Sequence, residues 1–246
     1  FLHLFPNVAV ILNIDEDHME YFKTLDNLIL SFHKFACLAK SAVIYNGDDE
    51  NTLKAVEGIE GKDMISFGFS DKNDYYAENI ESINGAYTRF DVMYKGKKLG
   101  RLSLAVPGVH NILNALASIA SAIYSGAKFE ACIEGLESFT GAGRRFEKLG
   151  TYCGIDFIDD YAHHPAELKV TLEAAMKLGY NTVWAVFQPF TYSRTVLHFD
   201  EFVDVLKIPD RCVMTEIMGS RETNTYGIYT SQLAEKIPNS VWFNTQ

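Results

Sequence analysis

The chain has 246 residues, with 22 Lys and Arg against 32 Asp and Glu, and therefore a formal net charge of −10. Its 48% hydrophobic residues can form a substantial core, and the length suggests one or two domains at about 150 residues each. The acidic balance and the absence of a Lys- or Arg-rich block exclude a general nucleic-acid phosphate binder. No apolar run approaches the roughly 20 residues that span a bilayer. We therefore expect no membrane insertion and a soluble, cytoplasmic protein.

The start of the chain and its cysteines carry further information. Residues 1–4 are apolar and lead almost at once into a core-like segment. Because natural termini are usually loose and polar, we expect the chain to begin inside a larger protein. The cysteines lie dozens of residues apart and without metal-site spacing, which favours reduced, buried structural thiols. They are Cys37, Cys132, Cys153 and Cys212.

The first half of the chain reads as an α/β unit. Residues 8–12 form an unbroken apolar run, as in strands buried on both faces. Thr24 can cap the next helix, whose apolar positions repeat with a period of 3.6 residues. Period-2 alternation over residues 75–106, with a turn at Gly96, predicts an antiparallel hairpin. The other elements predicted here are strands at 42–45 and 64–69 and helices at 50–56, 110–124 and 129–139.

A linker divides the two halves. Residues 140–143 contain two glycines, which can absorb large backbone rotations. We place a boundary there and expect domains at residues 1–142 and 143–246. Beyond the linker, strands and helices alternate, which is typical of βαβ crossovers and a parallel sheet. The predicted strands are 154–159, 182–187, 212–217 and 241–243, and the predicted helices are 165–178, 195–206 and 231–236.

Ligands of open α/β sheets bind at the carboxyl ends of the strands, so the loops that follow strands are the places to search. Residues 13–18 contain three carboxylates and one imidazole, that of His18. Oxygen ligands suit Mg²⁺, and a single histidine can join them. This loop is therefore a candidate magnesium site, although an ordinary solvated acidic loop explains the same residues.

The second candidate loop spans residues 159–165 and reads Asp-Asp-Tyr-Ala-His-His-Pro. Its proline occupies the first position of a predicted helix. The helix dipole disfavours protonation of the two histidines, which leaves neutral imidazoles that can donate a hydrogen bond to a substrate. The two side chains cannot both point the same way. Capping and turn chemistry explain the loop equally well.

Three further groups could bind anions or a nucleotide base. Arg194 lies near the start of a predicted helix, where a positive charge is unfavourable because it opposes the helix dipole. Either a bound anion or a solvent-exposed surface position would explain an arginine there. Arg144 and Arg145 follow the linker and offer two guanidinium groups to phosphate or carboxylate. Asn111 and Asn114 lie three positions apart on one helix face and suit the edge of a purine. No glycine-rich phosphate loop supports a nucleotide site by itself.

Taken together, these motifs occur in the order found in Mur ligases, and the chain resembles this family over essentially all of its length. The motifs are NIDEDHMEYF at 13–22, HNILNA at 110–115, RRFE at 144–147 and DDYAHHPAE at 159–167. The last of these, with FQPFTYSRT at 187–195, resembles most the members that add L-alanine. The family usually has a His or Arg pair where this chain has Phe190 and Thr191. Part of the expected contacts to the amino acid or phosphate is therefore absent or moved.

The resemblance implies an ATP- and Mg²⁺-dependent amide ligase of peptidoglycan synthesis, with UDP-N-acetylmuramate and L-alanine as substrates. ATP would phosphorylate the muramoyl carboxylate, and the alanine amine would attack the acyl phosphate. It also implies a partial central ATPase domain followed by an incomplete Rossmann-like, amino-acid-binding domain with a mainly parallel sheet. By motif, His18 would bind Mg²⁺, Asn111 and Asn114 would read adenine, Arg145, Asp160 and Tyr161 would hold ribose and phosphates, and His164 and Arg194 would position the amino acid or acyl phosphate.

Members of the family begin with a uridine-nucleotide domain and a phosphate-binding loop, which would precede Phe1. We therefore expect this chain to be inactive as a ligase by itself. Two alternatives remain open. One is a recycling ligase that joins a tripeptide to UDP-N-acetylmuramate, and the other is a catalytically inactive nucleotide-binding module.

Overall fold

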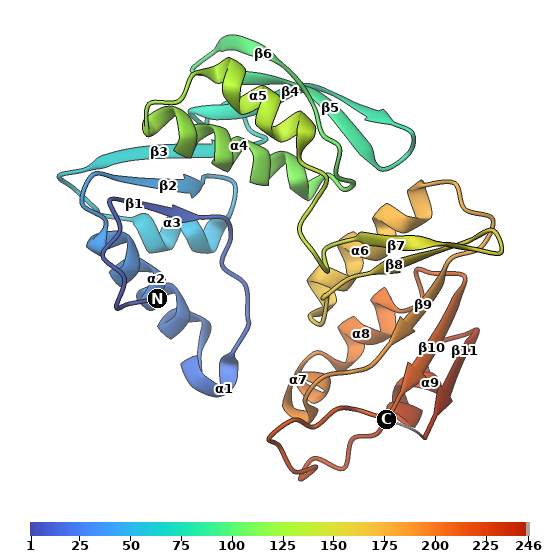
Figure 1. Ribbon diagram of the computed structural model, residues 1–246. Helices are drawn as coiled ribbons and strands as arrows, with labels where there is room; N and C mark the ends of the chain where they lie inside the picture. The colour runs from blue at the N-terminus through green and yellow to red at the C-terminus, as the bar shows by residue number, and fades with distance from the viewer. Residues whose placement is uncertain (245–246) are drawn as a thin grey trace. The chain divides into compact units, whose positions relative to one another are not determined.

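The computed structural model describes residues 1–244 and divides into two compact units (Figure 1). Unit 1 comprises Phe1–Ile83 and Tyr87–Thr140, and unit 2 comprises Asn84–Ala86 and the chain from Gly141 onward. Each unit has its own sheet and hydrophobic core, so the predicted α/β class is confirmed. Over the described residues, no helix is long and apolar enough to cross a membrane.

Unit 1 is built on a six-stranded sheet in which spatial order follows chain order. The first four strands are parallel, and the last two continue the sheet as the predicted antiparallel hairpin. Lys95 and Gly96 close this hairpin with φ angles of 47° and 78°, the left-handed conformation that a tight turn requires. The strands are β1 (Val8–Ile11), β2 (Ala42–Asn46), β3 (Asp63–Gly68), β4 (Tyr75–Ile83), β5 (Tyr87–Tyr94) and β6 (Lys97–Ser103).

Helices cover both faces of this sheet, because successive strand residues point to opposite sides. Val43 packs in the core beneath α2 and α3, whereas Ile44 packs in the core beneath α4 and α5. The predicted cap of α2 is confirmed, since the Thr24 hydroxyl accepts a hydrogen bond from the Asn27 N–H at 3.2 Å. The helices of unit 1 are α1 (Met19–Phe22), α2 (Leu25–Leu38), α3 (Glu50–Val56), α4 (His110–Tyr124) and α5 (Phe129–Ser138).

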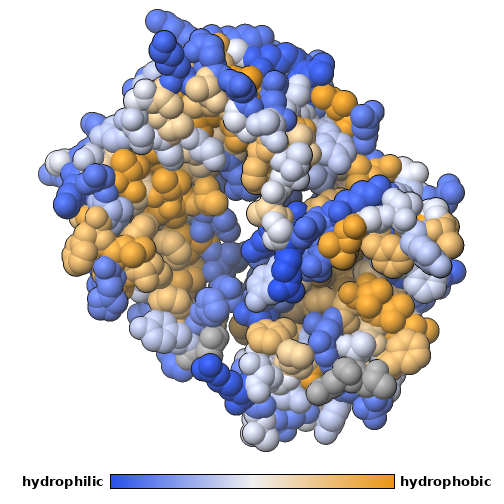
Figure 2. All heavy atoms as spheres, viewed as in Figure 1, coloured by the Kyte–Doolittle hydropathy of each residue, from blue (hydrophilic) through white to orange (hydrophobic). Residues whose placement is uncertain are grey.

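Unit 2 contains a three-stranded parallel sheet in the order β11-β10-β9. One face is covered by α6, α8 and α9, which bury Phe187, Phe202 and Met214. The other face carries Trp184 and Val186, which are 61% and 77% exposed. Figure 2 shows hydrophobic side chains gathered over these strands. The elements are β9 (Trp184–Phe187), β10 (Arg211–Thr215), β11 (Ser240–Phe243), α6 (Pro165–Lys177), α7 (Tyr192–Leu197), α8 (Phe199–Val205) and α9 (Thr230–Ala234).

Two predictions for unit 2 are wrong. The sequence predicts residues 154–159 in the parallel sheet, but β8 (Ile155–Asp159) pairs antiparallel with β7 (Glu147–Tyr152) in a separate hairpin. Its turn is closed by Cys153 and Gly154, both at positive φ, a pattern of tight hairpins that the strand assignment overlooked. The single helix predicted at 195–206 is two helices. The two helices are separated at His198, whose φ of −112° and ψ of 28° lie outside the helical region. His198 is buried.

The four cysteines are all free thiols. Cys132 and Cys212 are buried as predicted, and burial raises the pKa of both, that of Cys212 to about 11. Cys37 and Cys153 are exposed, so the expectation of a buried position is wrong for them. Cys37 lies near the end of α2, and Cys153 lies in the β7–β8 turn.

Candidate functional site

The loop after β1 is anchored to the start of α3. The Ile14 N–H donates to Asp49 Oδ1 at 3.4 Å, and Asn51 Nδ2 donates to the Ile14 carbonyl at 2.9 Å. Beyond this anchor, Asp17 Oδ1 accepts from the His18 N–H at 2.8 Å, and Asp17 Oδ2 lies 3.6 Å from His18 Nε2. His18 has a left-handed backbone, with φ at 56°, and its side chain is 64% exposed. The loop therefore presents one imidazole beside one carboxylate to solvent.

The two asparagines meet at the start of α4. Asn111 Nδ2 donates to the Pro107 carbonyl at 2.7 Å, and Asn111 Oδ1 accepts from Asn114 Nδ2 at 3.0 Å. The predicted common face is therefore confirmed. Asn114 is exposed, and over the described residues its carboxamide oxygen accepts no hydrogen bond. One fixed carboxamide thus orients a second, exposed one through its amide nitrogen and leaves the oxygen of the second as an acceptor.

The arginine turn at residues 144–146 precedes β7 in unit 2. Arg144 and Phe146 both have left-handed backbones, with φ at 59° and 48°. The turn places both guanidinium groups near Tyr161, with the Arg144 carbon 4.7 Å and the Arg145 carbon 6.0 Å from the ring centroid. Arg144, Arg145 and Tyr161 are each at least half exposed. Two cations and one aromatic face are therefore gathered at the surface, a set that suits an anion or a planar group.

Asp160 holds this turn to the rest of unit 2. Its Oδ2 accepts hydrogen bonds from the Phe146 N–H at 2.8 Å and from the Thr171 hydroxyl at 3.2 Å. Its Oδ1 accepts from the Ala162 N–H at 2.7 Å. Three donors from three segments of the chain therefore already hydrogen-bond to the carboxylate that, by resemblance to the family, would contact the nucleotide. Asp160 fixes the positions of its neighbours before any ligand binds.

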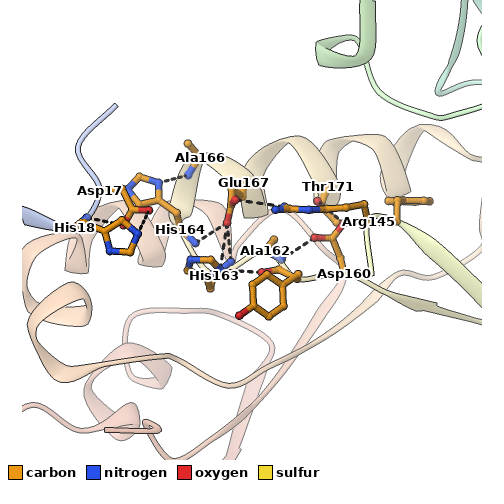
Figure 3. A network of polar contacts seen from close by, with 12 residues as sticks. Asp17, His18, Arg145, Asp160, Ala162, His163, His164, Ala166, Glu167 and Thr171 are labelled. Carbon is orange, nitrogen blue, oxygen red and sulfur yellow. Dashed lines mark hydrogen bonds and ion pairs between the residues drawn. The ribbon is translucent and has the colours of Figure 1, made fainter. Parts of the chain in front are cut away.

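The adjacent histidines take different directions, as predicted. His163 Nδ1 lies 2.9 Å from the Tyr161 carbonyl oxygen, whereas His164 caps α6 by accepting from the Ala166 N–H through Nδ1 at 3.3 Å (Figure 3). An accepting Nδ1 carries no proton, so the cap selects the neutral tautomer with hydrogen on Nε2. The His164 side chain is 7% exposed, and its ring meets the buried ring of His198 edge to face at 4.6 Å. The capping interpretation is thus confirmed for His164.

Glu167 links the cap to the arginine turn. Its Oε2 accepts from the backbone N–H groups of His163 at 3.1 Å and His164 at 3.3 Å, and its Oε1 lies 3.4 Å from Arg145 Nη1 (Figure 3). Burial opposes the charged carboxylate, but the backbone hydrogen bond from His163, the charge of its ring and the other donors outweigh it. The pKa of Glu167 is therefore lowered.

Arg194 lies in α7, where the loops after β9 and β10 are joined. The Thr191 N–H donates to the Met218 carbonyl at 2.9 Å, and the Ser193 hydroxyl and N–H both donate to Glu222, at 2.5 and 2.9 Å. These loops follow the carboxyl ends of parallel strands, where α/β sheets bind ligands. The segment that carries Arg194 is therefore held by hydrogen bonds to Met218 and Glu222 of the loop after β10.

The structure gathers four predicted residues into one network of unit 2: Arg145, Asp160, Tyr161 and His164. Arg194 lies one helical turn before His198, whose ring contacts His164; the His198 N–H donates to the Arg194 carbonyl at 3.0 Å within this turn. In unit 1, His18 occupies the N-cap position of α1, whereas Asn111 and Asn114 lie together on α4.

Two residues of the network were missed as site residues by the sequence analysis. Glu167 follows His164 at the spacing of a capping box, with the N-cap residue three positions before a glutamate, and this signal could have identified it. His198 gave no comparable signal, because its contact with His164 joins residues that are distant in the sequence.

A magnesium ion fits only one arrangement of these residues. Among the described residues, no group of three or more His, Cys, Asp or Glu could hold a metal ion. Mg²⁺ usually keeps several waters and takes one or two protein ligands together with substrate phosphates. Asp17 and His18 could supply such a minimal set, whereas a metal site made only of protein ligands does not fit.

The comparisons with known proteins identify the family. The Mur ligase middle domain matches residues 2–122, and the Mur ligase glutamate ligase domain matches residues 144–244. The chain therefore belongs to the Mur ligase family.

Two curated relatives and one solved structure illustrate the similarity. A UDP-N-acetylmuramate–L-alanine ligase of Caldanaerobacter subterraneus is 42% identical over 94% of this chain and 50% of its own length. One of Agathobacter rectalis is 41% identical over 99% of this chain and 54% of its own length. The solved UDP-N-acetylmuramate–alanine ligase of Thermotoga maritima is 27% identical with a TM-score of 0.78, over 99% of this chain and 52% of that one. The chain spans about half the length of the curated relatives that it matches.

Proposed function

We propose that the chain contributes to an ATP-dependent amide ligase that joins L-alanine to UDP-N-acetylmuramate in peptidoglycan synthesis. The names of its relatives support this substrate pair. The observation that carries the proposal is the network after β8, in which Asp160 and Glu167 hold Arg145, Tyr161 and the His164 cap in fixed positions. A central domain at residues 1–142 and an amino-acid-binding domain at residues 143–246 are part of the same proposal.

In this reaction, the γ-phosphate of ATP is transferred to the muramoyl carboxylate, and the amine of L-alanine then displaces phosphate from the acyl phosphate. Arg145 and Tyr161 hold the ribose and phosphates of ATP, because the arginine retains outward donors and the ring offers an exposed face. Asp160 acts by positioning these groups, since its carboxylate oxygens are already used within the chain.

Asn111 and Asn114 read the adenine edge. A carboxamide offers both a donor and an acceptor, and an adenine edge presents the complementary pair. Asn111 is held by Pro107 and in turn orients Asn114, so the outward carboxamide keeps one rotamer. A fixed rotamer reduces the entropy lost on binding.

Asp17 and His18 would hold the magnesium ion that accompanies ATP, because a carboxylate and an imidazole from one loop suit an ion that takes few protein ligands. When bound, the ion neutralises charge that develops on the phosphate oxygens. His18 contributes its imidazole from an exposed loop whose base is fixed to Asp49 and Asn51.

Arg194 stabilises the acyl phosphate or orients the carboxylate of the amino acid. Its helix is anchored by Glu222 through Ser193, so the guanidinium extends from a supported segment. His164, with its proton on Nε2, acts as a buried, neutral hydrogen-bond donor. Its ring also packs against the ring of His198, the residue at which α7 ends.

The test is phosphate release by the protein that carries this chain, with ATP, Mg²⁺ and UDP-N-acetylmuramate. We expect release to depend on L-alanine. Release that requires a tripeptide instead would support a recycling ligase, and ATP binding without release under any amine would support an inactive nucleotide-binding module. Either result would overturn the assigned substrate pair.

A further inference from the structure

We propose that Glu167 is a positioning residue that fixes the Arg145 guanidinium for the nucleotide phosphates, an inference that rests on the nucleotide role proposed above for Arg145. Glu167 lies in the first turn of α6 and faces the arginine turn that precedes β7. Figure 3 shows its carboxylate between the two histidine N–H groups and the arginine side chain.

The two carboxylate oxygens of Glu167 bind different partners. Oε2 accepts the N–H groups of His163 and His164 and so completes the capping box of α6. Oε1 is the atom that faces Arg145 Nη1, at 3.4 Å. One side chain therefore ties a helix start to a cation contributed by a different segment.

Arg145 needs such a partner, because its side chain is 54% exposed and has many rotamers. Glu167 holds one edge of the guanidinium, and the Tyr161 ring lies 6.0 Å from its carbon. A guanidinium has five N–H donors, and over the described residues only Nη1 donates to a side chain. The donors on the other edges remain oriented and available for phosphate oxygens.

The cation keeps the carboxylate charged in return. Arg145 is among the groups that lower the pKa of Glu167, together with the His163 ring and the two backbone donors, while burial acts in the opposite direction. Glu167 is therefore a permanent counter-ion near neutral pH.

Glu167→Gln separates the cap from the ion pair. The carboxamide oxygen of glutamine can replace Oε2 at the backbone donors, since Gln also forms capping boxes. Its NH₂ group then occupies the place of Oε1 and meets the guanidinium donor to donor. The cap is retained while the partner of Arg145 is lost, whereas Glu167→Ala removes both.

The experiment measures ATP affinity and the unfolding temperature in the protein that carries this chain. We expect Glu167→Gln to weaken ATP binding about two- to fivefold, the range of a partly exposed ion pair, with little change in unfolding temperature. Glu167→Ala should weaken binding by the same factor and lower the unfolding temperature by about 2 to 4 °C. In the Arg145→Ala background, Glu167→Gln should have no further effect on affinity, because the two changes act through one contact.

Glu173→Gln on α6 is the matched control, since it removes the same charge without a contact to Arg145 among the described residues. It should leave ATP affinity unchanged. If Glu167→Gln binds ATP as tightly as the parent while Arg145→Ala binds it weakly, the positioning role is overturned and the nucleotide site stands. If Arg145→Ala itself binds ATP normally, the nucleotide role of Arg145 falls, and the inference falls with it.

Discussion

Two loops of this protein combine acidic residues with histidine and differ in construction. Each follows a strand: residues 13–18, with three carboxylates and one histidine, come after β1, and residues 160–164, with one carboxylate and two histidines, come after β8. In the first, the Asp15 and Asp17 carboxylates each accept a hydrogen bond from the N–H of the next residue. In the second, the Asp160 carboxylate accepts from Phe146 and Thr171, which are 14 and 11 positions away.

The difference shows that residue types identify a candidate loop but not its degree of preorganisation. Bonds between neighbours form in any turn, whereas bonds to distant segments exist only once the unit has folded. The loop after β1 is held to a distant segment at Ile14, by Asp49 and Asn51, whereas the loop after β8 is held through the carboxylate of Asp160 itself. We infer that the carboxylate of the loop after β8 is the more rigidly placed before ligand binding. The changes below test this contrast.

The largest expected effect is on catalysis. Arg194→Ala should raise the activation free energy by about 2 to 4 kcal/mol, the cost of losing one well-placed charge in a preorganised site, while ATP affinity changes little. The measurement is L-alanine-dependent phosphate release. Arg211→Ala, which removes an exposed arginine of β10, is the control and should retain full turnover. Normal turnover in Arg194→Ala would reduce Arg194 to a surface cation.

Asp160→Ala should lower the free energy of unfolding of unit 2 by about 2 kcal/mol, because three backbone and side-chain donors lose their acceptor. Asp15→Ala in the other loop should change it by less than about 0.5 kcal/mol. Denaturant unfolding measures both. Equal losses in the two variants would remove the contrast between the loops.

His18→Ala should leave thermal stability nearly unchanged, since the side chain is 64% exposed. It should weaken Mg²⁺-dependent ATP binding by about tenfold, the lower end of what losing support at a metal site costs. Titrations with ATP at several Mg²⁺ concentrations measure this. An equal effect on binding without Mg²⁺ would contradict the metal role.

The smallest expected effect is on stability at acid pH, and it arises in the β7–β8 hairpin, which leads into the loop after β8. The Lys148 ammonium, with Thr151 and Tyr180, lowers the pKa of Asp156 to about 2. Because the folded state has the lower pKa, this carboxylate stabilises the protein at pH values above about 4, the range of a free aspartate. The stabilisation is lost as the pH falls through about 2. Asp156→Asn should therefore reduce the acid dependence of unfolding, measured between pH 5 and 2; an unchanged dependence would contradict it.

The fold could largely be predicted from the sequence, because its signals are local. Apolar runs, the Thr24 cap and the Gly96 turn each act within a few residues and lead to the observed elements. The β7–β8 hairpin was missed because residues 154–159 read equally well as a parallel or an antiparallel strand. The break at His198 coincides with a ring contact to His164, which no helical periodicity encodes.

The candidate site was predictable as a set of residues but not as an arrangement. The motifs named Arg145 and Asp160, yet they did not show that the Asp160 carboxylate accepts from Phe146 and Thr171 or that Glu167 faces Arg145. Those relations connect residues more than ten positions apart and arise only from tertiary packing.

The pairing between the loops after β9 and β10 has an evolutionary consequence. The Met218 N–H donates to the Pro189 carbonyl at 2.8 Å, and the Met218 carbonyl accepts from the Thr191 N–H at 2.9 Å. Both bonds use main-chain atoms only, so they do not depend on the side chain at position 190, and at position 191 they require an N–H donor that tolerates a φ of 66°. Selection can therefore exchange these two residues and alter what the surface recognises without rebuilding the scaffold. The Phe and Thr found here are one outcome of that freedom.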